Sequence, residues 1–169
     1  MVDEFFSQLA KQQDETLGIW PKETVSISRT FAYSLIYMGL NRLPPQPEKI
    51  VDAMLNLQKE SGFWEDRPAF ATMDTVYLLS DLAKKIGWRV SEANNALHRA
   101  MDALIPYYQR SVNGYKEDTH QLLAIVQTWA LLSQALPERF STLHPWRFGW
   151  KESRFWQAKV IKDELVRDT

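Results

Sequence analysis

Cysteine is absent from this chain of 169 residues, and neither sign of charge is in clear excess. Without Cys, a disulfide framework, a thiolate nucleophile and a thiolate-bound zinc site are excluded. The 20 basic and 21 acidic residues give a net charge of -1, which favours neither nucleic acid nor an anionic membrane as a partner. The three His residues lack the spacing of a metal-binding pair. We therefore expect no metal ion and no cofactor.

Long apolar runs are also missing. The longest, residues 122–132, is interrupted by Gln127 and Thr128 and is too short to span a bilayer. The first six residues are acidic and lack the apolar core of a signal peptide. We expect a cytoplasmic protein, unless the chain is a fragment whose targeting signal lies elsewhere.

Gly and Pro separate segments in which apolar residues recur every three or four positions, the spacing of an amphipathic helix. No segment alternates as a half-buried strand does. Ser26 or Ser28 can cap one helix, Ser91 can cap another, and Gly87 can end one. The sequence predicts an all-α fold with helices over residues 3–15, 26–38, 47–60, 72–86, 91–111 and 118–136.

A Gly-aromatic turn precedes every second predicted helix, at Gly18, Gly62 and Gly114, with spacings of 44 and 52 residues. The helices after these turns are apolar on more of their circumference than the others, so they should form an inner row. This pattern predicts an array of three αα-hairpins within residues 1–140, with units of about 3–39, 47–87 and 91–137.

Residues 141–169 break the repeat and are rich in aromatic and basic side chains. An atypical last unit is the usual terminal cap of stacked repeats, and we interpret this segment as a C-terminal cap. The alternative is an interface for a second copy of the chain, which would form a homodimer, or for a missing domain of a longer chain. The aromatic residues concerned are Trp146, Phe148, Trp150, Phe155 and Trp156.

The second turn has the pattern Gln58-x-x-x-Gly62-x-Trp64, which resembles the QW repeat of terpenoid cyclases. Residues 13–20 are a looser copy with one extra residue, and the third copy keeps only Gly114-Tyr115. The wider group with this repeat architecture is the α/α toroid, which includes prenyltransferase β subunits and many glycan lyases and hydrolases. Because a closed toroid has about six hairpins, the resemblance implies a half toroid.

The same resemblance places a ligand at the inner-helix ends, near the Gly-aromatic turns. The Asp-rich acid and magnesium motifs of the terpenoid enzymes are absent, which favours a carbohydrate over an isoprenoid. Glu65 lies in the same turn as Trp64, Asp66 and Arg67. The candidate ligand-binding residues form an aromatic-acidic rim: Trp20, Trp64, Asp66, Arg67, Tyr115, Asp118 and His120.

Each group of candidates has a structural alternative. The Trp residues of a QW repeat tie neighbouring outer helices together, whereas a sugar-binding role needs an open ring face. Carboxylates at helix N-termini stabilise the helix dipole, whereas acid-base chemistry needs a pKa near neutrality. The leading hypothesis is a lobe that binds or processes a carbohydrate. The alternative is a non-catalytic helical-repeat module that binds a protein, and enzymatic activity is left open.

Overall fold

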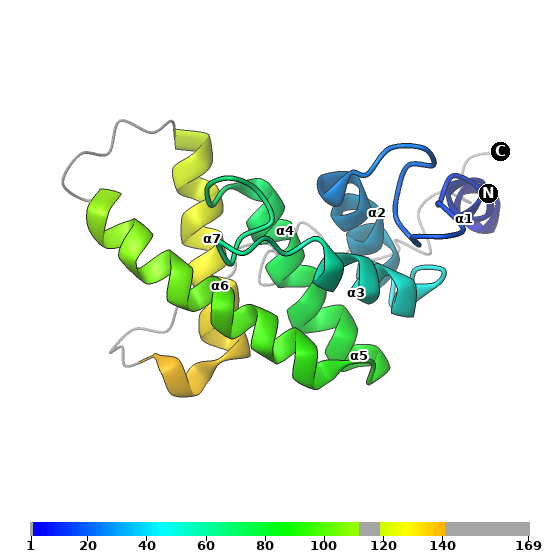
Figure 1. Cartoon of the computed structure of the whole chain (residues 1–169). Coiled ribbons are helices and arrows are strands. Elements are labelled where there is room, and N and C mark those ends of the chain that lie inside the picture. Colours follow the sequence, from blue (N-terminus) through cyan, green and yellow to red (C-terminus); the bar gives the residue numbers. More distant parts are fainter. Residues whose placement is uncertain (1, 112–118, 141–169) are drawn as a thin grey trace, which may run out of the picture.

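The computed structural model describes residues 2–111 and 119–140, and every regular element within these residues is helical (Figure 1). The all-α prediction is therefore confirmed for this part of the chain. Tyr115, Asp118 and the segment 141–169 lie outside the described residues. The elements are α1 (Val2–Lys11), α2 (Ile27–Gly39), α3 (Pro47–Asn56), α4 (Phe70–Tyr77), η1 (Leu78–Ala83), α5 (Lys84–Ile86), α6 (Val90–Ser111), α7 (Thr119–Ala135) and η2 (Pro137–Arg139).

Local signals explain where several helices begin and end. The Ser26 side chain caps α2 by accepting a hydrogen bond from the amide of Arg29. Pro47 occupies the first turn of α3, where its missing N–H costs nothing. Gly87 follows α5 in the left-handed conformation, with φ of 69°, and ends the helix.

Other boundaries differ from the sequence prediction. The helices expected over 3–15 and 47–60 end earlier, at Lys11 and Asn56, because the residues that follow enter the Gly-aromatic turns. Helix α6 begins at Val90, so Ser91 lies inside the helix and the prediction that it is the N-cap was wrong.

A π-helical segment was not predicted from the sequence. Residues Phe70–Ile86 form one continuous helical rod in which η1, a π-helix over Leu78–Ala83, separates α4 from α5. A π-helix has i→i+5 hydrogen bonds and is rare outside functional or strained places. The apolar spacing of these residues is compatible with an ordinary α-helix, so periodicity could not reveal it.

The rod Phe70–Ile86 lies at the centre of the packing. α4 contacts α2 and α7, while η1 contacts α3 and α6, and α3 and α6 contact each other. Figure 1 shows α2, α4 and α7 as neighbours, with α3 and α6 lying across them. Fully buried apolar side chains fill the space between these helices: Ile50, Met54, Met73, Leu78, Leu82, Leu97, Leu104 and Ile125.

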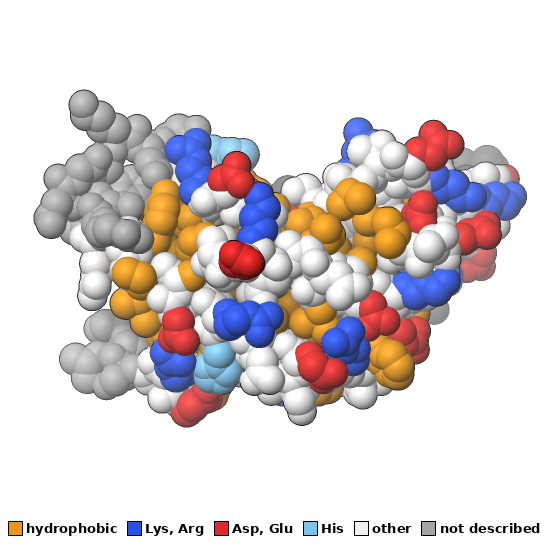
Figure 2. Space-filling view, in the orientation of Figure 1, with side chains coloured by type: hydrophobic (Ala, Val, Ile, Leu, Met, Phe, Trp, Pro, Cys, Tyr) orange, Lys and Arg blue, Asp and Glu red, His pale blue; other side chains and the backbone are white. Residues whose placement is uncertain are grey.

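Helix α7 is enclosed on part of its surface. Its apolar residues run nearly all round the helix, which indicated burial on several sides. Leu122, Leu123 and Val126 are exposed, while the rest of α7 packs against α4 and α6, so burial extends over part of the helix surface. Charged side chains of both signs are scattered over the face seen in Figure 2. No helix within the described residues combines the length and the hydropathy needed to cross a bilayer.

Candidate functional site

The two Gly-aromatic turns within the described residues close in the same way. In the first, the amide of Asp14 donates to the carbonyl of the residue after Gly18 at 2.8 Å, and the amide of Gly18 donates back to Asp14 at 2.8 Å. In the second turn, the amide of Lys59 donates to the carbonyl of the residue after Gly62 at 2.8 Å, and the amide of Gly62 donates back to the carbonyl of Lys59 at 2.9 Å. The extra residue of the first copy is therefore accommodated inside the loop.

Both turn glycines lie against the next outer segment of the chain. Gly18 and Gly62 have φ of +69° and +87°, a conformation that favours glycine. A Cβ on Gly18 would lie 2.5 Å from the Cβ of Lys49, and one on Gly62 would lie 2.8 Å from the carbonyl oxygen of Arg99. Glycine is thus required at both positions by conformation and by close approach.

The Gln side chain of each turn ties two units together. The Nε2 of Gln13 donates to the carbonyl of its own turn glycine and to that of Pro45, both at 2.7 Å. The Nε2 of Gln58 donates to its own turn glycine and to Ala96 of α6, both at 2.9 Å. Each amide therefore joins its own turn to the beginning or body of the following outer helix.

Trp20 and Trp64 are part of the same ties. The indole N–H of Trp20 donates to the carbonyl of Leu9 at 2.8 Å, and that of Trp64 donates to Met54 at 2.6 Å. In both cases the accepting residue lies four positions before the turn Gln. The two Trp side chains are 0% and 5% exposed, so the fold uses both rings and neither presents an open face to a ligand.

Helices α2, α4 and α7 begin at one end of the molecule. The rings of Phe70, at the start of α4, and His120, at the start of α7, lie 4.1 Å apart between centroids. The side chain of Gln121 donates to the carbonyl of Pro68 at 3.1 Å and links the same two helix starts. We call this region the helix-start end, and its residues are Ser28, Glu65, Phe70, Asp74 and His120.

Two other candidates from the sequence, Asp66 and Arg67, lie in the turn before α4 and are exposed. Asp66 forms an ion pair with Lys59 at 2.6 Å, and the hydrogen bond and charge of that lysine lower the pKa of the Asp66 carboxyl. Tyr115 and Asp118 lie outside the described residues. The structure thus places His120 beside the start of α4 and leaves Asp66 and Arg67 in solvent.

A buried carboxyl group lies beneath the helix-start end. Asp74 is 2% exposed, and its side chain is hydrogen-bonded to that of Ser28 in α2. Burial raises the pKa of the Asp74 carboxyl to about 7; the Ser28 hydrogen bond opposes this rise, and the negative charge of Glu65 adds to it. A carboxyl group with such a pKa can give and take a proton at neutral pH.

Glu65 holds the start of α4 from the preceding turn. One of its carboxylate oxygens accepts hydrogen bonds from the amides of Ala69 and Thr72, both at 2.9 Å. The hydroxyl of Thr72 is buried and has no hydrogen-bond partner. The Glu65 carboxyl in the turn before α4, the Asp74 carboxyl and the unpaired Thr72 hydroxyl in the first turns of α4 therefore lie close along the chain.

The sequence prediction missed Asp74 and Ser28 as a pair. A signal was present, because Asp74 lies between Met73 and Val76 in a segment that is otherwise apolar or small. An acidic residue on the buried side of a helix has to be paired or neutral. Its partner comes from another helix, and periodicity does not identify such a neighbour.

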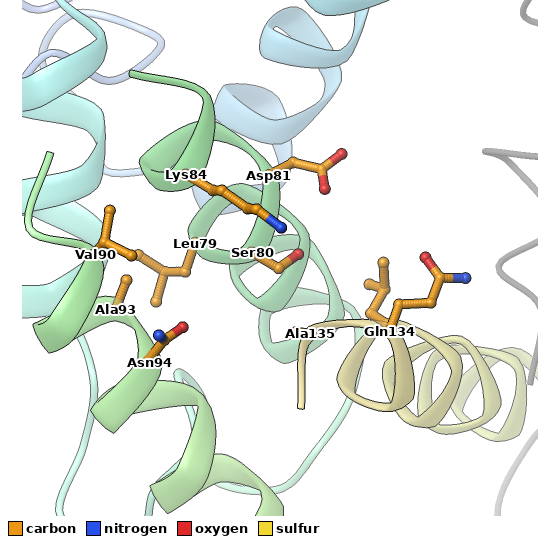
Figure 3. A pocket seen from close by; sticks show the side chains of 10 residues that line it. Leu79, Ser80, Asp81, Lys84, Val90, Ala93, Asn94, Gln134 and Ala135 are labelled. Carbon is orange, nitrogen blue, oxygen red and sulfur yellow. The ribbon is translucent and has the colours of Figure 1, made fainter. Parts of the chain in front are cut away.

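A pocket of about 360 Å³ lies at the other end of the rod Phe70–Ile86 (Figure 3). No sequence motif indicated it, because its walls come from three separate segments of the chain. It is lined by Leu79, Ser80, Asp81 and Lys84 from the rod, by Val90, Ala93 and Asn94 from α6, and by Leu131, Gln134 and Ala135 from α7.

No group of three or more His, Asp or Glu side chains that could hold a metal ion occurs in the described part of the chain. Comparisons with protein-family models, with curated proteins and with solved structures found no match. The resemblance of the Gln-Gly-Trp turns to a QW repeat therefore stays a prediction.

Proposed function

We propose that this chain is one lobe of an α/α-toroid-type protein that binds a carbohydrate at the helix-start end. The observation that carries the proposal is the buried Asp74 carboxyl, which shares the start of α4 with Glu65 and has a pKa of about 7. Asp74 is 2% exposed, so a sugar hydroxyl reaches its protonated carboxyl only when the side chains above it move aside, while Glu65 accepts a hydrogen bond from the same ligand.

The repeated contacts support the architectural part of the proposal. Two Gln residues, two turn glycines and two Trp residues make equivalent bonds in consecutive units. Equivalent ties between successive units are what a stack of αα-hairpins needs. We propose that a third unit follows at α6 and α7, that the three hairpins form a half toroid, and that residues 141–169 cap it.

The polar character of the helix-start end favours a carbohydrate over an isoprenoid. Arg67 and His120 are exposed there and can bind hydroxyl groups, while the Phe70 ring is half-buried beside His120. An isoprenoid would need an apolar cavity lined by ring faces. The rings of Trp20 and Trp64 are buried in the core, so they do not line such a cavity. In this proposal Asp74 forms the floor of the site and Arg67 and His120 form its rim.

The test is a binding assay with matched carboxyl variants. Cellohexaose, a neutral glucan, and an oligogalacturonate, an acidic one, are titrated into the wild type, Asp74→Asn, Glu65→Gln and Asp66→Asn by calorimetry. We expect one of the two glycans to bind the wild type and Asp66→Asn, and to bind the first two variants about tenfold less tightly, since each loses a hydrogen bond to a charged or ionisable group.

Circular dichroism checks that each variant keeps its helix content. The proposal fails if neither glycan binds the wild type, or if Asp74→Asn binds as well as Asp66→Asn.

A second candidate function is a non-catalytic helical-repeat module that binds a protein, and the exposed side of α7 favours it. Leu122, Leu123 and Val126 are 37–46% exposed on a helix whose other side packs against α4. Hydrophobic side chains reach the surface in the region of α6 and α7 (Figure 2). Contiguous exposed apolar residues on one helix are typical of a protein-binding surface.

A further inference from the structure

The pocket at the far end of the rod Phe70–Ile86 is separate from the helix-start end. Asp74 lies near the beginning of this rod and Lys84 near its end, about 15 Å apart along the axis at 1.5 Å per residue. The pocket walls are η1, the first turns of α6 and the last turns of α7. Every lining residue belongs to the described part of the chain.

Three polar side chains of the pocket have no partner in the described structure. Lys84, Asn94 and Gln134 line the pocket, and none of them makes a hydrogen bond or an ion pair within the described residues. Ser80 donates to the carbonyl of Tyr77 at 3.1 Å, which leaves its oxygen free to accept. Figure 3 shows Lys84, Ser80 and Asn94 directed toward the space between the rod and α6 and α7.

Asp81 is the second charged residue that lines the pocket. Its carboxylate is hydrogen-bonded to the hydroxyl of Tyr77, and burial together with this acidic neighbour raises the pKa of that hydroxyl. In Figure 3 the Asp81 carboxylate points away from the side chain of Lys84. Of the two charged groups that line the pocket, the ammonium of Lys84 is therefore the one that makes no hydrogen bond or ion pair within the described residues.

The π-helix η1 forms part of the pocket wall. Leu79, Ser80 and Asp81 all belong to η1. A π-helical turn contains an additional residue, so it changes which side chains face a given direction compared with an α-helix. Here the irregular segment and the pocket coincide, which is the combination frequently found at functional sites.

We propose that this pocket binds a small hydroxylated carboxylate of the size of a single sugar acid. The ammonium of Lys84 pairs with the carboxylate, and Ser80, Asn94 and Gln134 supply donors and acceptors for hydroxyl groups. The buried side chains of Leu79, Ala93 and Leu131 form an apolar floor for the carbon skeleton. The volume of about 360 Å³ lies at the small end of ligand pockets.

Lys84 can also stabilise the end of its helix, and the test must separate this structural role from ligand binding. Lys84 and Lys85 both lie in the last turn of the rod, where positive charge stabilises the helix dipole. Both lysines are exposed, but only Lys84 lines the pocket. Lys85→Gln is therefore a matched control, since it removes the same charge from the same turn.

The experiment is a ¹H–¹⁵N NMR titration with sodium D-glucuronate at constant ionic strength, and D-glucose serves as the neutral probe. We expect saturable shifts confined to the amides of 79–84, 90–94 and 131–135. Lys84→Gln should weaken binding about tenfold, because a charge-assisted hydrogen bond is lost, whereas Lys85→Gln and Asp74→Asn should bind as the wild type does.

The proposal is overturned if glucuronate causes no saturable shifts, if the two lysine variants titrate alike, or if glucose shifts the same amides with equal affinity. The dispersion of each variant's spectrum reports that it is folded. Because Asp74→Asn leaves this pocket intact, failure here and failure of the carbohydrate proposal at the helix-start end are distinguishable.

Discussion

At the scale of single residues, Gly62 and Gly87 have similar backbone conformations in different surroundings. Their φ angles are +87° and +69°, but a Cβ on Gly62 would meet the carbonyl of Arg99 at 2.8 Å, whereas one on Gly87 would meet nothing within 4 Å. The two positions therefore separate the cost of a left-handed conformation from the cost of close packing.

We expect Gly87→Ala to lower the free energy of unfolding by about 1 kcal/mol, the strain of a left-handed alanine. Gly62→Ala should lower it by about 3 kcal/mol or more, because α6 has to move away as well. Urea denaturation followed by circular dichroism measures both. Equal losses would show that the turn does not hold α6 at this distance.

Asp74 makes stability depend on pH. Its pKa is 3.8 ordinarily and about 7 in the folded chain, so the folded state holds a proton that the unfolded state releases between these values. The favourable contribution is complete below about pH 4 and is lost as pH rises to about 7. The free energy of unfolding should fall by up to about 1.4 kcal/mol per pH unit across that window.

Asp74→Asn should remove this dependence and should be more stable than the wild type at pH 8, because Asn resembles the neutral acid. Urea unfolding at pH 5, 6, 7 and 8 measures the slopes. Asp66→Asn is the control, since Asp66 is exposed and its pKa is lowered by Lys59. If the wild type and Asp74→Asn have the same slope, Asp74 is not the group responsible.

At the scale of elements, the Gln ties determine how one hairpin meets the next. Gln13 and Gln12 are adjacent, but Gln13 is buried and donates to two backbone carbonyls, whereas Gln12 is exposed. Gln13→Ala should lower the free energy of unfolding by about 2–4 kcal/mol, because one buried and one half-buried carbonyl lose their donor. Gln12→Ala should change it by less than about 0.5 kcal/mol.

Thermal and urea unfolding of both Gln variants tests this expectation. A Gln13→Ala variant as stable as Gln12→Ala would mean that water replaces the side-chain amide at no cost, and the tie would then be dispensable.

The sequence correctly predicted helix ends at which a capping or helix-breaking residue is present. Ser26, Pro47 and Gly87 act on the backbone within one turn, and the helices begin and end near them. The sequence prediction failed for η1, because the apolar spacing of these residues is compatible with an ordinary α-helix. It also placed the ends of α1 and α3 too late, since the chain leaves the helix to bring Gln13 and Gln58 into the turns.

At the scale of the whole molecule, α7 is the outermost helix of the row α2, α4 and α7. Leu122, Leu123 and Val126 expose apolar surface on this helix, and burying that surface against a second chain would be favourable. We expect light scattering on a sizing column to show a mass above that of one chain, and Leu123→Glu to return it to that of one chain.

The control is Leu17→Glu, because Leu17 is also exposed but lies in the first turn, away from α7. If the wild type elutes as a single chain, the exposed side of α7 is not a self-association surface. A dimer that Leu17→Glu also dissociates would assign the contact to another face.

The order of amino acids was sufficient for the helical class and for the turn glycines, because these depend on contacts close along the chain. Periodicity reports which residues share a helix face, and a Gly-aromatic turn reports its own conformation. The pairing of Ser28 with Asp74, the burial of Trp20 and Trp64 and the pocket around Lys84 depended on helices meeting in space. Burial is the main cause that raises the Asp74 pKa toward neutrality, and burial exists only after the helices have packed.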